Sequence, residues 1–150
     1  MKFILTRELG RLARWLRILG YDTLYFKEDK PSSLIIEALR DDRIILTRNR
    51  RLSSSGGVRV ILIEKEKMGE QIPEVLQKLG IEAKKEQMFS RCILCNSELA
   101  SIDKEKIRGK VPEYVFKTQD TFFTCPQCQR IYWQGTHWGN VENTLKEMIR

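Results

Sequence analysis

Short apolar runs alternate with amphipathic stretches over the first eighty residues. Four apolar runs, each too short for a helix, predict buried strands at residues 2–6, 22–26, 43–47 and 58–63. Three stretches with apolar positions three or four residues apart predict helices at residues 8–19, 31–40 and 71–79. Strands that alternate with helices in this way predict an α/β fold, with a mostly parallel sheet flanked by helices.

The pattern changes after about residue 89, where segments become short and rich in threonine and aromatic residues. This pattern predicts β-hairpins with strands at residues 111–116, 122–124 and 130–133. We therefore expect two domains, an α/β domain over residues 1–86 and a small β domain over residues 87–150.

The composition is that of a folded chain, with 41% hydrophobic and 31% charged residues among 150. No apolar run approaches the roughly 20 residues that cross a bilayer. The run at residues 3–5 is too short for the core of a signal peptide. We expect a cytoplasmic protein with no membrane partner.

The charge balance favours a polyanionic partner, since 27 Lys and Arg residues stand against 20 Asp and Glu residues, a net charge of +7. Arginine pairs with phosphate through two parallel hydrogen bonds more readily than lysine does. The candidate nucleic-acid contacts lie on the first helix and after the third strand: Arg7, Arg11, Arg14, Arg17, Arg48, Arg50 and Arg51. The alternative is that these arginines only keep the surface soluble.

Four cysteines form two C-x-x-C pairs, Cys92/Cys95 and Cys125/Cys128. Two such pairs supply the four sulfur ligands of a closed tetrahedral zinc shell, which predicts a structural zinc site and a β zinc ribbon. The alternatives are a redox dithiol or buried free cysteines. Nearby, Trp133, His137 and Trp138 form either a platform on which bases stack or a packed turn.

Several motifs resemble the Mut-7 C-terminal RNase family, and they follow one another in that family's order. They are residues 9–22 (LGRLARWLRILGYD), 45–48 (ILTR), 91–96 (RCILCN), 125–128 (CPQC) and 132–138 (YWQGTHW). The resemblance spans nearly the whole chain. It implies a PIN-like nuclease domain followed by a zinc ribbon.

The resemblance also implies acidic residues at the carboxyl edge of the sheet that hold Mg²⁺ or Mn²⁺ for RNA hydrolysis. This sequence departs from that pattern, because Thr6 and Asn49 stand where Asp is expected and Ser32 stands near a third acidic position. Glu8 and Glu37 are the spare acids. With Arg7 and the arginines after the third strand nearby, we expect a net positive pocket that attracts phosphate and excludes metal.

Three functions fit these features. The first is an RNA-binding protein of the nuclease family that has largely lost the nuclease carboxylates. The second is a metal-dependent endoribonuclease that uses relocated acids in RNA processing. The third is an adaptor that docks on a ribosome or another protein, and a ribosome or tRNA is a candidate source of the RNA.

Overall fold

The computed structural model describes residues 1–52, 57–133, 143–144 and 146–148. Backbone contacts divide the chain into two compact units, Met1–Asn96 and Ser97–Arg150, each described by itself below. None of the helices in the described residues is both long enough and apolar enough to span a membrane.

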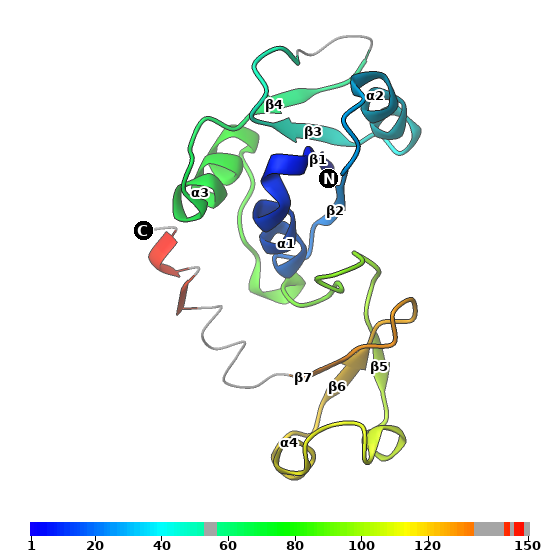
Figure 1. The fold of residues 1–150 in the computed structure, drawn as a ribbon. Helices are drawn as coiled ribbons and strands as arrows, with labels where there is room; N and C mark the ends of the chain where they lie inside the picture. Colours follow the sequence, from blue (N-terminus) through cyan, green and yellow to red (C-terminus); the bar gives the residue numbers. More distant parts are fainter. Residues whose placement is uncertain (53–56, 134–142, 145, 149–150) are drawn as a thin grey trace. The chain divides into compact units, whose positions relative to one another are not determined.

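The first unit is built on a four-stranded parallel sheet (Figure 1). Its strands are β1 (Lys2–Leu5), β2 (Asp22–Tyr25), β3 (Ile44–Thr47) and β4 (Val60–Leu62). They lie in the order β2-β1-β3-β4, and every neighbouring pair is parallel. The α/β fold expected from the alternation of strands and helices is confirmed.

The helices of this unit cover the sheet. They are the 3₁₀ turn η1 (Arg7–Leu9), α1 (Gly10–Ile18), α2 (Pro31–Arg40), α3 (Met68–Leu79) and the 3₁₀ turn η2 (Lys85–Gln87). From α2, Leu34 and Ala38 pack against Ile4 and Ile45 of the sheet. Helices α1 and α3 lie side by side (Figure 1). Right-handed crossovers place α1 and α2 on opposite faces, because β2 and β3 flank β1 on opposite sides.

The reversal of strand order at β1 determines where a ligand site can form. The chain leaves β1 toward β2 and then returns past β1 to β3. In open parallel sheets, ligands bind beyond the carboxyl ends of the strands on either side of such a switch point. Here those ends are Leu5, which precedes Thr6, and Thr47. The backbone N–H of Thr6 continues the ladder by donating to the Leu46 carbonyl at 3.2 Å.

The second unit contains a three-stranded antiparallel sheet in the order β5-β6-β7. Its elements are β5 (Ala100–Ile102), the 3₁₀ turn η3 (Lys104–Ile107), α4 (Glu113–Thr118), β6 (Phe122–Thr124) and β7 (Ile131–Trp133). Ile107, Val115 and Phe122 form its small buried core. The fully buried core that the described residues form in this unit is therefore small, which is typical of domains that metal ligands stabilise.

The strand predicted at residues 111–116 is wrong, because the helix α4 occupies this segment. Pro112 precedes its first turn, where a missing backbone N–H costs nothing, and the acidic Glu113 follows at the positive end of the helix. Lys117 pairs with Glu113 one turn away at 3.1 Å. These local signals favour a helix over the strand propensity of Val115 and its aromatic neighbours.

Candidate functional site

A pocket of about 250 Å³, which we call the sheet-edge pocket, opens at the switch point of the first unit. The segments that follow β1, β2 and β3 and the start of α2 supply its walls. Its lining residues are Thr6, Arg7, Glu8, Phe26, Glu28, Asp29, Lys30, Pro31, Leu34, Thr47, Asn49 and Leu52. The predicted positions Thr6, Glu8 and Asn49 are thus brought together in one pocket.

One carboxylate oxygen, Oε1 of Glu8, is the centre of the hydrogen bonding in this pocket. The Thr6 hydroxyl donates to it at 2.6 Å, and the backbone N–H of Arg48 donates to it at 3.0 Å. The Thr47 hydroxyl lies 3.4 Å from the same oxygen and 2.9 Å from the Thr6 hydroxyl. The two threonines and Glu8 therefore form one polar network across the ends of β1 and β3.

This network keeps Glu8 ionised. Partial burial alone would raise the pKa of the Glu8 carboxyl. The hydrogen bonds from Thr6, from the Arg48 backbone and from Thr47 outweigh burial and hold the pKa below its ordinary value. Glu8 thus supplies a fixed negative charge at the position where the resemblance implies metal-binding acids.

The described residues that line the sheet-edge pocket are not net positive, which contradicts the expectation of a net positive pocket. Glu8, Glu28 and Asp29 contribute three carboxylates to its lining, against the two cations of Arg7 and Lys30. The carboxylates do not converge, however. Within the described part of the chain, the only group of three or more ligand-type side chains close enough to share one ion is formed by cysteines.

Several other predicted residues lie away from this pocket. Glu37 pairs with Arg40 on α2 at 3.2 Å and does not line the sheet-edge pocket, but it lines a neighbouring pocket that shares Phe26 and Glu28 with it. Ser32 is exposed in the first turn of α2 and does not line the pocket. The Arg48 guanidinium lies along the chain after β4, where it donates to the carbonyls of Ile63 and Glu64.

Arg50 and Arg51 are exposed after β3. The backbone N–H of Arg51 donates to the side-chain oxygen of Asn49 at 3.0 Å. Asn49 therefore closes a tight turn as well as lining the sheet-edge pocket.

Sequence reasoning missed Glu28 and Asp29. Both follow β2, whose carboxyl end lies at the same edge as those of β1 and β3. The available signal was their position three and four residues after the strand, because loops that follow parallel strands line this edge of a sheet.

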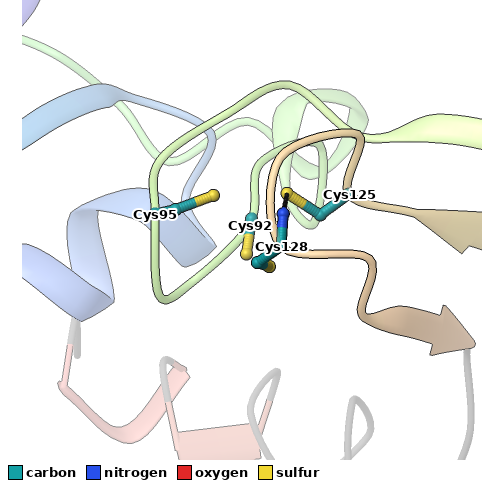
Figure 2. A group of neighbouring side chains, drawn as sticks. All are labelled: Cys92, Cys95, Cys125 and Cys128. Carbon is teal, nitrogen blue, oxygen red and sulfur yellow. Dashed lines mark hydrogen bonds between the residues drawn. The ribbon is translucent and has the colours of Figure 1, made fainter.

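The four cysteines form a second site (Figure 2). Their sulfur atoms all lie within 4.8 Å of one another. Four sulfurs held about 2.3 Å from one zinc ion in a tetrahedron are about 3.8 Å apart, so the arrangement fits a four-sulfur metal shell after a small contraction. The predicted cysteine cluster is confirmed as a group that could hold a metal ion.

The two C-x-x-C turns have the same backbone geometry. The residue after each pair, Asn96 or Gln129, has a left-handed backbone with φ of 73° or 65°. Its N–H donates to the carbonyl of the first cysteine of the pair, at 2.9 Å for Cys92 and 2.8 Å for Cys125. In the second turn the Cys128 N–H also lies 3.5 Å from the Cys125 sulfur (Figure 2). Each turn thus presents its two sulfurs on one side.

The first cysteine turn is fastened to α1 by Arg17. Its Nε donates to the Thr23 carbonyl at 2.9 Å, and its Nη1 donates to the carbonyls of Ile93 and Leu94 at 2.8 and 3.1 Å. Burial lowers the pKa of this guanidinium, although the group stays charged. Arg17 is 8% exposed, in contrast to Arg11 and Arg14 of the same helix, which are exposed.

Asn96 fastens the same turn to β2. Its side-chain oxygen accepts from the Thr23 N–H at 2.8 Å, and its side-chain nitrogen donates to Asp22 at 2.6 Å. Asp22 in turn accepts from Arg43 at 2.7 Å. The first cysteine turn is therefore an integral part of the α/β unit.

The predicted aromatic platform is described only in part. Trp133 is half-buried and packs against Phe122, with the ring centres 6.5 Å apart. His137 and Trp138 lie outside the described residues.

Comparisons with known proteins complete this description. Neither a curated protein nor a solved structure matches the sequence. The model of one family, described as the Mut7-C RNAse domain, matches residues 1–145. The order of motifs, the parallel sheet and the four-cysteine cluster agree with this match. The chain belongs to the Mut7-C RNase domain family.

Proposed function

We propose that this protein binds RNA and that its sheet-edge pocket has lost the ligand set for metal-dependent cleavage. One observation carries the proposal: the acids of the pocket do not gather around a common point. Thr6 and Asn49 supply neutral oxygens there, and Glu8 already accepts hydrogen bonds from Thr6 and Arg48 on one oxygen. Two metal ions about 4 Å apart need surrounding anions, and the described residues offer no such group of acids.

Family membership and charge support RNA as the partner. The net charge of +7 attracts a polyanion. The matching family is described as an RNase domain, which makes RNA the expected polyanion. Arg7 and Lys30 bring positive charge to the rim of the sheet-edge pocket. The RNA phosphates can therefore contact these two cations even though the pocket does not hold the metal ions that hydrolysis needs.

The four cysteines hold a structural zinc ion in this proposal. A shell of four thiolates leaves no open position for water, so the metal stabilises the fold and does not act on RNA. Thiolate ligands persist in a reducing compartment, which agrees with a cytoplasmic location.

A metal-dependent endoribonuclease is the second candidate, and the three acids in the sheet-edge pocket favour it. Mg²⁺ is often bound through one or two carboxylates together with substrate phosphates. Glu28 and Asp29, on the loop after β2, line the same pocket as Glu8. RNA itself would then complete a ligand set that the protein alone lacks.

One experiment separates the candidates. A fluorescently labelled single-stranded RNA is titrated with the protein over a range of salt concentrations, and its length is then checked after incubation with Mn²⁺. We expect binding that weakens steeply with salt, and intact RNA. Absence of binding would refute the proposal and favour an adaptor. Cleavage that is lost in a Glu28→Gln/Asp29→Asn variant would instead establish the endoribonuclease.

A further inference from the structure

A second hollow, of about 570 Å³, lies on the first unit outside the sheet-edge pocket. We call it the α1 hollow. Its walls are one face of α1, the end of β2 together with Lys27, and the first cysteine turn. Among its lining residues are Arg11, Arg14, Arg17, Tyr25, Lys27 and Leu94.

The charge of the α1 hollow has one sign. Four of its lining residues are cationic, namely Arg11, Arg14, Arg17 and Lys27, and none of the described residues that line it is acidic. In the part of the chain that the structure describes, Arg11 and Arg14 have no ion-pair partner. These charges are therefore available to an anion, in contrast to the mixed charges of the sheet-edge pocket.

Buried hydrogen bonds hold part of this cationic surface in place. Arg17 is fixed by three backbone carbonyls, two of them from the cysteine turn, so its positive charge stays beneath the hollow. Because the protein holds this charge before a ligand arrives, little conformational entropy is lost at this position on binding.

Tyr25 and Gly10 fix the opposite wall. The Tyr25 hydroxyl donates to the Arg7 carbonyl, and its ring packs so close to Gly10 that a Cβ there would lie 3.2 Å from the ring. The Lys27 ammonium lies 6.0 Å from the centre of the Tyr25 ring. The absence of a side chain at Gly10 thus permits the close contact that orients the Tyr25 ring. The ring in turn attracts the Lys27 ammonium to this side of the hollow.

We propose that the α1 hollow is a phosphate-binding site that grips the RNA backbone, separate from the sheet-edge pocket. This inference rests on the proposed function for the identity of the polymer. Arg11 and Arg14 are three residues apart and share one helix face, so both guanidinium groups reach the same opening. A guanidinium binds phosphate through two parallel hydrogen bonds, and the exposed arginines are free to do so.

The test compares an Arg11→Gln/Arg14→Gln variant with an Arg59→Gln control. Arg59 is also exposed and belongs to the same unit, but it lies outside both the α1 hollow and the sheet-edge pocket. Glutamine keeps the helix propensity of arginine and removes only the charge. Metal content and thermal unfolding are measured for each variant to show that the fold is intact.

Binding of a labelled 12-nucleotide oligouridylate is measured from low to moderate salt. Each phosphate contact contributes about 0.7 to the slope of log K against log salt for a single strand, so the double variant should lose about 1.4. With equal affinities at 1 M salt, this change in slope makes the double variant bind roughly 25-fold more weakly than the wild type at 0.1 M salt. A double variant with the same affinity and slope as the Arg59→Gln control would overturn the site while leaving RNA binding intact.

A titration with inorganic tripolyphosphate, followed by NMR of the backbone amides, tests whether the α1 hollow binds an anion independently of whether the protein binds RNA. Shifts at Gly10, Arg11 and Lys27 that are absent in the double variant would support an anion site even if the wild type bound no RNA. In that case the proposed function would fail and the site would stand. Shifts confined to other residues would overturn the site.

Discussion

Among the described residues, ligand-type side chains gather in the cysteine cluster and in the sheet-edge pocket, and of these two the cysteine cluster alone is arranged to hold an ion by itself. The four sulfurs lie within 4.8 Å of one another. In the sheet-edge pocket, Glu8, Glu28 and Asp29 share one cavity without converging. Residue types alone therefore do not make a metal site, because the donor atoms must also approach a common point.

The difference has a local cause. Each cysteine pair is set by one short turn, in which the residue after the pair adopts a left-handed backbone and closes a hydrogen bond to the first cysteine. The acids of the pocket come from two separate loops, and Glu8 is drawn into hydrogen bonds with Thr6 and the Arg48 backbone. A short turn orients its side chains directly, whereas acids on separate loops depend on how the whole sheet is assembled.

Replacing a cysteine should have the largest effect. The binding energy of a structural zinc, on the order of 10 kcal/mol, is also folding energy. For Cys125→Ser we expect loss of most of the bound metal and a melting temperature lower by more than about 10 °C. Metal analysis and thermal unfolding would check this result, with Thr124→Ser as the neighbouring control. Unchanged metal content and melting would refute the metal site.

Removing the support of the first cysteine turn should have the next largest effect. Arg17→Met deletes a buried charge and leaves the carbonyls of Thr23, Ile93 and Leu94 without their donor. The bond to Thr23 is buried and the bonds to Ile93 and Leu94 are half-buried. An unpaired buried polar group costs about 1–3 kcal/mol, so we expect the free energy of unfolding to fall by about 3 kcal/mol. Denaturant unfolding would measure it.

Arg11→Met is the matched control for this change, because Arg11 is an exposed arginine on the same helix. We expect it to alter the free energy of unfolding by no more than about 0.5 kcal/mol. Equal effects of the two variants would mean that Arg17 does not hold the turn.

Adding acids should turn the sheet-edge pocket into a metal site. In a Thr6→Asp/Asn49→Asp variant, a carboxylate at position 6 stands close to Glu8, and the repulsion should destabilise the metal-free protein by about 1–2 kcal/mol. Mn²⁺ should restore that stability, since a ligand that binds only the folded state raises its melting temperature.

Thermal unfolding with and without Mn²⁺ would check this conversion, with Thr6→Asn as the uncharged control. A variant whose melting temperature does not respond to Mn²⁺ would contradict the placement of the pocket at the ends of β1 and β3.

The smallest effect should come from Glu8→Gln, and it should depend on pH. Hydrogen bonds lower the pKa of Glu8 in the folded state, so the charged carboxylate stabilises the fold above its unfolded pKa of about 4.5. That stabilisation is lost as the pH falls through the lowered folded pKa. Urea unfolding of both proteins from pH 7 downward should therefore show a gap that narrows in acid. A gap that is constant with pH would show that Glu8 acts only through packing.

Much of the α/β unit could be predicted from the sequence because its signals are local. The apolar runs and helical periodicity identified all four strands and three helices, and the spacing of the cysteines identified the metal cluster. Each of these signals is contained in a few neighbouring residues. The apolar runs and the helical periodicity predict the same element wherever one face of that element is buried. The strand predicted at residues 111–116 is wrong because Pro112 and Glu113 favour the start of a helix, and this preference outweighs the strand propensity of the residues that follow.

The charge of each surface was decided only by the tertiary structure. Arg17 and Arg14 are indistinguishable by residue type and lie three residues apart, and both line the α1 hollow. Arg17 is nevertheless buried and bonded to backbone carbonyls, whereas Arg14 is exposed. Glu28 reaches the sheet-edge pocket and Glu37 does not. The sequence by itself determined which charges the chain carries and the elements on which they lie. Their partners depend on contacts between distant segments, and those contacts exist only once the sheet has assembled.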